Sequence, residues 1–141
     1  MKGIADTGFL VAFVSRRDLH HEWALGVERQ LTAPLLTCEA VLAETAFHLQ
    51  DVRIVLGLLE DGFISLAFDA NDHIPHLAAM ARRYADRKPD LADLCLIRMS
   101  ELNPNLSVLT TDREDFRVYR RNKRETIPLL CPPKHLRWRQ S

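Results

Sequence analysis

The sequence predicts an α/β protein, a three-layer α/β/α sandwich with a mostly parallel central sheet. Short apolar runs alternate along the chain with segments of helical periodicity. Strands separated by helices form βαβ units, whose strands are parallel and whose helices cover both faces of the sheet. The 141 residues, 47% of them hydrophobic, suffice for one core. We therefore expect residues 1–141 to form a single domain.

In the first half of the chain we expect strands at residues 3–5, 35–37 and 64–68, and helices at 9–14, 20–31, 39–49 and 54–59. Trp23, Val27 and Leu31 recur every fourth residue, which is helical spacing. Pro34 separates that helix from the second strand. The fourth helix is expected to stop at Gly62, because glycine is common just beyond a helix end.

In the second half we expect helices at 72–85, 91–102 and 115–119, and strands at 106–109 and 127–130. The first of these helices has Ile74, Leu77 and Ala81 at helical spacing, so these residues are expected to face inward. The sequence contains no internal repeat and no linker. This supports the prediction of one continuous domain.

Composition excludes several classes of protein. The three cysteines, Cys38, Cys95 and Cys131, are far apart, which argues against a disulfide framework or a CxxC zinc site. No apolar run approaches the ~18 residues that span a bilayer. The N-terminal apolar stretch contains Asp6 and lacks a cleavage site typical of a signal peptide. We expect a cytoplasmic protein with no membrane segment.

The net charge is zero but unevenly distributed. Residues 1–112 contain 10 Lys/Arg and 16 Asp/Glu, whereas residues 113–141 contain nine and three. A basic cluster comprises Arg120, Arg121, Lys123 and Arg124. It either binds the phosphates of a polyanion or forms a solvated turn, and the sequence leaves both interpretations open.

Acidic residues occur where the predicted strands end. Asp6 and Asp112 each follow a strand, Glu44 lies in the helix after the second strand, and Asp93 opens the helix at 91–102. In parallel sheets, ligands bind beyond the carboxyl ends of the strands. Each acid also has a plainer interpretation. Asp6 can cap a helix, and the pairs Asp90/Asp93 and Asp112/Asp115 have capping-box spacing. Glu44 is harder to explain, because its helical neighbours are apolar.

If these four carboxylates converge, they require a cation. Two like charges at 4 Å repel by ~4 kcal/mol at an effective dielectric of 20. No lysine or arginine stands beside Asp6, Glu44 or Asp112 on the strand side. Oxygen ligands favour Mg²⁺ or Mn²⁺ over zinc, and Mg²⁺ is commonly completed by substrate phosphates. The expected chemistry is hydrolysis of a phosphodiester by a metal-bound water.

Histidines and tryptophans are weaker candidates. The six histidines lack metal-site spacing, and His20 and His21 point about 100° apart on a helix. His48 lies one turn after Glu44 and either bonds that carboxylate or covers the edge of the core, which we favour. Trp23 and Trp138 could stack on bases, although the spacing of Trp23 favours the core.

The acids occur in recognisable motifs. These are Asp6-Thr7-Gly8, then Glu44 in a helix, then Asp90-Leu91-Ala92-Asp93, then Thr110-Thr111-Asp112 followed by Phe116. In this order they resemble the PIN domain, and most closely the VapC-type toxin ribonucleases, from about residue 3 to residue 130. Two departures are Gly8, where serine is common, and Leu94-Cys95, where a smaller pair is usual.

The resemblance implies an endoribonuclease with a parallel α/β/α sandwich fold, a Mg²⁺ or Mn²⁺ cofactor, a homodimer and a cognate antitoxin. It assigns catalysis and metal binding to Asp6, Glu44, Asp93 and Asp112. Asp90 and Asp115 match nearby positions that are often acidic, and we expect them to surround the ligands without binding the metal directly. Thr7 and Thr110 match positions with a small hydroxyl side chain that orients the carboxylates. From the acidic pocket and the resemblance together, we expect the antitoxin to lay an apolar helix in a groove and insert a basic side chain among the acids.

Two rival functions follow from the same residues. The chain could be a catalytically silent module that only binds RNA or protein, which the intact set of four acids argues against. A receiver-like signalling domain also places acids at strand ends. It needs a phospho-accepting aspartate in mid-chain and a lysine on a late strand. Asp69 and Asp72 are poor candidates, and no lysine matches.

Overall fold

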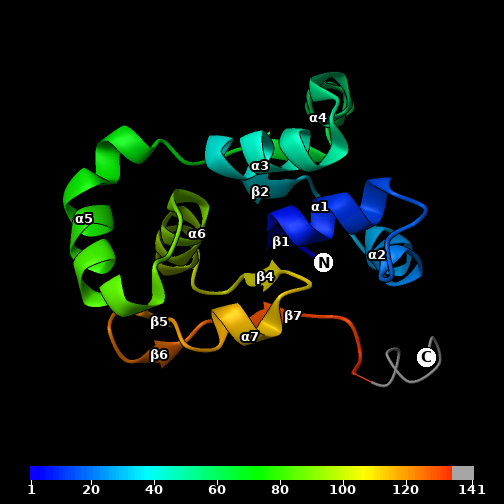
Figure 1. Ribbon diagram of the computed structural model, residues 1–141. Coiled ribbons are helices and arrows are strands. Elements are labelled where there is room, and N and C mark those ends of the chain that lie inside the picture. Colours follow the sequence, from blue (N-terminus) through cyan, green and yellow to red (C-terminus); the bar gives the residue numbers. More distant parts are fainter. Residues whose placement is uncertain (135–141) are drawn as a thin grey trace.

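The computed structural model describes residues 1–134 and contains a five-stranded sheet in the order β3-β2-β1-β4-β7 (Figure 1). Every neighbouring pair of strands in it is parallel. The strands are short: β1 (Gly3–Ala5), β2 (Leu35–Thr37), β3 (Ile64–Leu66), β4 (Ser107–Leu109) and β7 (Leu129–Leu130). The α/β class and the parallel sheet predicted from the sequence are confirmed. Trp138 lies outside the described residues.

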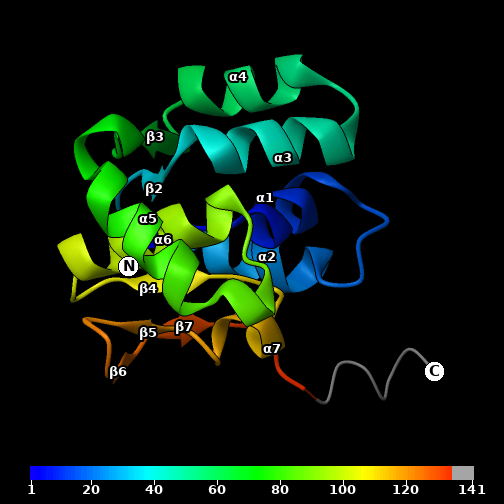
Figure 2. The same ribbon diagram turned by 60° about the vertical axis from the view of Figure 1, so that its left-hand side comes forward.

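Helices cover both faces of this sheet. They are α1 (Thr7–Val14), α2 (His21–Glu28), α3 (Glu39–Leu49), α4 (Val52–Glu60), α5 (Ile74–Arg83), α6 (Leu91–Leu102) and α7 (Arg113–Phe116). Figures 1 and 2 show α1 and α2 on one side of the strands and α5 and α6 on the other. Helix α3 packs against α1, α4 and α6. No helix within residues 1–134 is long and apolar enough to cross a membrane.

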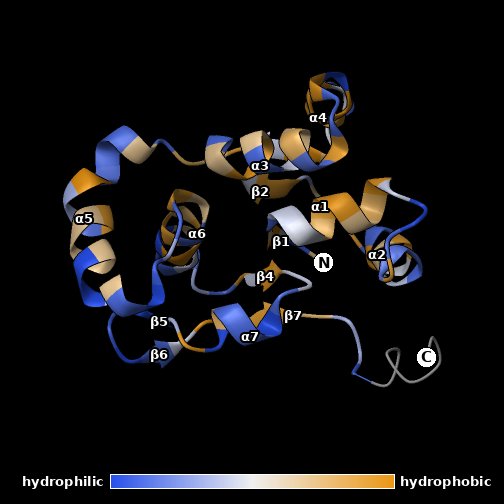
Figure 3. Ribbon diagram, in the orientation of Figure 1, coloured by the Kyte–Doolittle hydropathy of each residue, from blue (hydrophilic) through white to orange (hydrophobic). Residues whose placement is uncertain are grey.

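The hydrophobic core is centred on the strands, whose residues are apolar. Ile4, Ala5, Leu35, Val108 and Leu109 are fully buried, and Figure 3 shows the central strands as hydrophobic. Strands buried on both faces are typical of parallel sheets, whose helices exclude water from each side.

The strand order creates a crevice between β1 and β4. The chain builds β1, β2 and β3 in one direction across the sheet and then returns to the other side of β1 to add β4. Helices on opposite faces diverge at such a switch in strand order, which leaves space beyond the carboxyl ends of the two central strands. Asp6 directly follows β1, and Thr110 directly follows β4.

The structure corrects several predicted boundaries. Helix α1 begins at Thr7 rather than residue 9, because Asp6 caps it. Of the predicted helix at 72–85, only α5 is α-helical. A 3₁₀ turn lies on each side of it, at Ala70–His73 and at Ala85–Arg87. Pro75, in the first turn of α5, cannot donate a backbone hydrogen bond, so it suits a helix start.

A small hairpin was not predicted. It consists of β5 (Arg120–Arg121) and β6 (Glu125–Thr126), which pair antiparallel beside the main sheet. With its turn, the hairpin contains all four residues of the basic cluster identified in the sequence.

Candidate active site

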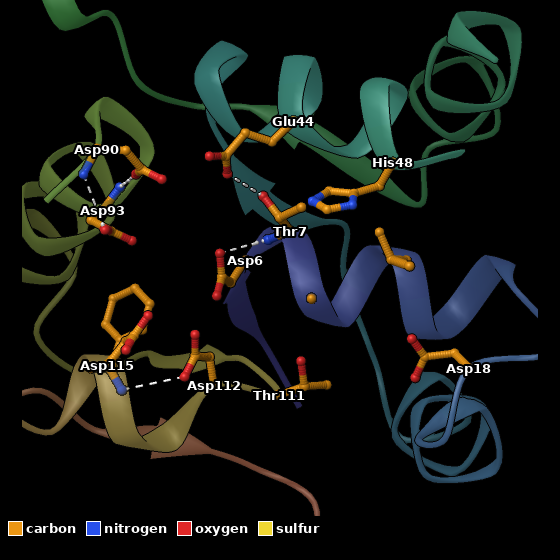
Figure 4. Close-up of a pocket in the computed structure, with 13 residues that line it drawn as sticks. Asp6, Thr7, Asp18, Glu44, His48, Asp90, Asp93, Thr111, Asp112 and Asp115 are labelled. Atoms are coloured by element: carbon orange, nitrogen blue, oxygen red, sulfur yellow. Dashed lines mark hydrogen bonds between the residues drawn. The ribbon is translucent and has the colours of Figure 1, made fainter. Parts of the chain in front are cut away.

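A pocket of about 380 Å³ lies over the carboxyl ends of β1 and β4 (Figure 4). Seven acidic residues line it: Asp6, Asp18, Glu44, Asp90, Asp93, Asp112 and Asp115. They come from segments far apart in the sequence, and the four acids predicted as metal ligands are all among them. Asp6, Glu44, Asp93 and Asp112 therefore share one cavity.

Asp6 is the most buried of these acids, with 9% of its surface exposed. One carboxylate oxygen accepts the backbone N–H of Thr7 at 2.6 Å and caps α1. The other accepts the hydroxyl of Thr110 at 2.7 Å. The Thr110 hydroxyl oxygen in turn accepts the backbone N–H of Asp112 at 3.0 Å. This chain of bonds ties the end of β1 to the loop after β4.

Glu44 is held by a second threonine. The hydroxyl of Thr7 donates to Glu44 Oε1 at 2.7 Å, across the contact between α1 and α3. The side chain is half-buried and directed toward Asp6 in Figure 4. Thr7 and Thr110 thus contact the predicted ligands Glu44 and Asp6, as the resemblance implies.

Asp90 and Asp93 form a reciprocal capping box at the start of α6. The Asp90 carboxylate accepts the backbone N–H of Asp93 at 2.8 Å, and the Asp93 carboxylate accepts that of Asp90 at 3.3 Å. The positive end of the α6 dipole favours negative charge there. The cap holds both side chains at the rim of the pocket.

Asp112 and Asp115 make one of these two bonds on another wall of the pocket. Asp112 Oδ1 accepts the backbone N–H of Asp115 at 3.3 Å and caps α7. Because only Oδ1 makes this bond, the second oxygen of Asp112 remains available to a ligand. Asp115 also lines the pocket.

The pocket concentrates negative charge. Among residues 1–134, neither lysine nor arginine lines it. Burial is the largest cause of a raised pKa at Asp6, and the charges of Asp112 and Asp90 add to it. Burial and then the neighbouring Asp90 carboxyl raise the pKa of Glu44. Burial and then the charge of Asp90 raise the pKa of Asp93 to about 7.

The donor set fits a hard divalent cation. Its side-chain donors are mainly carboxylate and hydroxyl oxygens, and within residues 1–134 no lysine or arginine in the lining balances their negative charge. In residues 1–134, however, no three such side chains approach closely enough to hold an ion as they stand.

The structure adds residues that sequence reasoning missed or assigned differently. Asp18, in the loop between α1 and α2, lines the pocket and accepts the backbone N–H of His20 at 2.8 Å. His48 was expected to cover the core edge, but it is exposed and lines the pocket. The spacing of four residues from Glu44 had offered a place beside that carboxylate as the alternative, and the pocket lining agrees with that alternative. The rest of the lining consists of Thr7, Gly8, Val11, Thr111 and Phe116.

A glycine at position 8 avoids a steric clash with Thr111. A Cβ atom added at this position would overlap Thr111 Oγ1, so the glycine lets the loop after β4 lie against the first turn of α1. The serine that is common at this position would require Thr111 to rotate.

Comparison with known proteins agrees with this geometry. No curated protein was found to match the chain. The model of the PIN domain matches residues 4–122, which include all seven acids of the pocket. PIN domains are generally nucleases, acting on nucleic acids. Because the match covers most of the chain, this protein belongs to the PIN domain family.

Proposed function

We propose that this protein is an endoribonuclease that depends on Mg²⁺ or Mn²⁺ and hydrolyses RNA phosphodiesters. One observation carries the proposal: Asp6, Glu44, Asp93 and Asp112 line a single pocket that no lysine or arginine lines within residues 1–134. A phosphodiester is itself an anion and would be repelled by these side chains alone. A divalent cation would reconcile the two.

Asp6, Glu44, Asp93 and Asp112 would hold the cation. When bound, it would supply positive charge for the phosphate and activate water for attack. The residues behind them fix their orientation. Thr7 directs one oxygen of Glu44, and Thr110 directs one oxygen of Asp6, each through a hydrogen bond of 2.7 Å. The capping bond at Asp112 leaves its second oxygen available. No protein nucleophile is required.

Cleavage of a labelled single-stranded RNA tests this proposal. We expect the parent to cut with Mn²⁺ or Mg²⁺ and to stop when EDTA removes the metal. Asp6→Asn should lower the rate by about 10²–10³-fold, the scale of losing one catalytic electrostatic group. Glu60→Gln is the matched control. It removes an exposed carboxylate at the end of α4 and should cut RNA at the rate of the parent. Equal cleavage by Asp6→Asn and the parent would refute the catalytic assignment.

A catalytically silent binding module is the second candidate. The separation of the carboxyl groups favours it, since no three of these acids within residues 1–134 are close enough to hold an ion as they stand. The same preparation distinguishes the two functions. A silent module binds RNA or protein but shows no Mn²⁺-dependent cleavage and no stabilisation by Mn²⁺.

We further propose that this protein is the toxin of a type II toxin–antitoxin pair and forms a homodimer. Exposed apolar side chains beside the pocket support a docking partner: Phe47 is 80% exposed, next to His48 of the pocket, and Val52 and Leu56 follow on α4. The antitoxin would lay an apolar helix there and place a basic side chain among the acids. Co-purification from the native operon, with light scattering for the dimer, tests this. A lone, non-toxic monomer would contradict it.

A further inference from the structure

A second pocket, of about 360 Å³, has the opposite charge. It lies between α5, α6 and the turn of the β5–β6 hairpin, which sits beneath α5 in Figures 1 and 2. Arg83, Arg98, Lys123 and His76 line it, and Glu101 is the one acid in its lining among residues 1–134. We refer to this cavity as the basic pocket.

Glu101 does not cancel the charge of the basic pocket. One carboxylate oxygen accepts Arg98 at 3.1 Å, and the other accepts the backbone N–H of Asn122 at 2.6 Å. The Arg98 and Glu101 side chains are only 16% and 11% exposed. Arg98 is therefore matched by Glu101, whereas Arg83 and Lys123 leave a net charge of about +2 for a ligand.

The structure divides the basic cluster of the sequence into two groups. Arg120 donates to the carbonyls of Arg117 and Tyr119, and Arg121 donates to the carbonyls of Ser100 and Pro104. These two guanidinium groups hold the hairpin in place. Lys123 lies at the turn and, within residues 1–134, makes no side-chain hydrogen bond or ion pair.

The backbone conformation of this turn is energetically unfavourable for residues other than glycine. Asn122 and Lys123 both have positive φ, 49° and 70°, in the left-handed region that favours glycine. The bond from Asn122 N–H to Glu101 anchors the turn. On the other wall, Arg83 lies with its guanidinium carbon 5.9 Å from the centre of the Tyr84 ring. Both free cations are thus presented from anchored segments.

The two pockets are joined by α6. Its first turn carries Asp93 of the acidic pocket, and its last two turns carry Arg98 and Glu101 of the basic pocket. The eight residue steps from Asp93 to Glu101 span about 12 Å along the helix axis. A stacked strand rises about 3.4 Å per nucleotide along its own axis, so a strand parallel to α6 covers this distance in about four nucleotides.

We propose that the basic pocket binds backbone phosphates of an RNA strand a few nucleotides from the phosphodiester held in the acidic pocket. Arg83 and Lys123 make the contacts, and Arg98 and Glu101 support them. This inference rests on the ribonuclease function proposed above. It predicts a site that is indifferent to base sequence and sensitive to salt, because phosphate contacts carry no sequence information.

The test compares the parent with the double variant Arg83→Gln/Lys123→Gln. Its ligand is a labelled RNA of about 12 nucleotides, and EDTA prevents hydrolysis. Losing two phosphate contacts should reduce the slope of log affinity against log salt by about 1.4, and affinity at ~0.15 M salt by about tenfold. Cleavage of a dinucleotide with Mn²⁺, too short to reach the basic pocket, should be unchanged.

A matched control removes two charges elsewhere. Lys2→Gln/Arg29→Gln alters two exposed cations, Lys2 just before β1 and Arg29 after α2, neither of which lines the basic pocket. This variant should keep the affinity of the parent to within about twofold. Equal losses in both double variants would show a general charge effect and overturn the proposal.

The remaining outcomes separate this site from the catalytic proposal. If no RNA is cut but Arg83→Gln/Lys123→Gln still weakens binding, the ribonuclease function fails and the basic pocket stands. If RNA is cut and the affinity of this variant equals that of the parent, the basic pocket fails alone. Displacement of the RNA by micromolar inorganic phosphate, in the parent but not in the variant, would assign the pocket to a free phosphate and overturn the RNA assignment.

Discussion

Replacing Asp93 with asparagine should stabilise the metal-free protein while weakening the proposed binding of Mn²⁺. Burial and the charge of Asp90 raise the pKa of Asp93 from 3.8 to about 7. The folded chain therefore binds a proton more tightly at this carboxyl than the unfolded chain does. The free energy of unfolding then falls as pH rises from about 4 to about 7, and stays low above that range.

The size of the effect follows from the same shift. A rise in pKa from 3.8 to about 7 corresponds to about 4 kcal/mol. The side chain is half-buried, so solvent screening reduces this to about 1–2 kcal/mol. Asparagine carries no charge and keeps a carbonyl oxygen for the N–H of Asp90, so the helix cap loses only a few tenths of a kcal/mol.

Thermal unfolding in EDTA measures this prediction. At about pH 8 the Tm of Asp93→Asn should exceed that of the parent by about 3–8 °C, and at about pH 4 the two should coincide. Addition of Mn²⁺ should raise the Tm of the parent at about pH 8 and leave that of the variant nearly unchanged, because only the parent gains binding free energy. A variant less stable than the parent at about pH 8 without metal would refute the electrostatic argument.

Two further predictions concern hydrogen bonds. Thr7→Val removes the hydroxyl that directs Glu44, so the initial rate of RNA cleavage should fall about tenfold while Tm changes by less than about 3 °C. An unchanged rate would show that Glu44 needs no such support. Arg121→Ala leaves the carbonyls of Ser100 and Pro104 without this donor and should cost about 1–3 kcal/mol in urea unfolding. Arg124→Ala, an exposed control, should stay within about 0.5 kcal/mol; equal losses would contradict the anchoring role of Arg121.

The sequence predicted the fold best where apolar runs were uninterrupted. Helix α6 matches its predicted bounds, because residues 91–102 contain no glycine or proline and Asp90 provides a clear cap. The five strands of the main sheet were all predicted, although β3, β4 and β7 are shorter than expected. Short strands buried on both faces lack alternation, so their ends depend on pairing partners that the sequence does not reveal.

The β5–β6 hairpin escaped prediction for a different reason. Its strands have two residues each, and Arg120, Arg121, Glu125 and Thr126 offer no apolar periodicity. Tertiary contacts stabilise the hairpin, because Tyr84 and the end of α6 form hydrogen bonds with it. The basic pocket was hidden from the sequence for the same reason, because its cations come from three separate segments.

The acids of the pocket were predictable because the capping positions and the predicted ligand positions coincide. In the sequence, an acid after a strand could be a helix cap or a ligand, and these were treated as alternatives. Asp6, Asp90 and Asp112 all cap helices and all line the pocket. A helix that follows a parallel strand begins at the carboxyl edge of the sheet, so its cap faces the crevice there. Capping occupies one carboxylate oxygen of each acid. The second oxygen accepts the Thr110 hydroxyl at Asp6 and takes no part in the cap at Asp112, so in both cases the cap fixes the position of the charge.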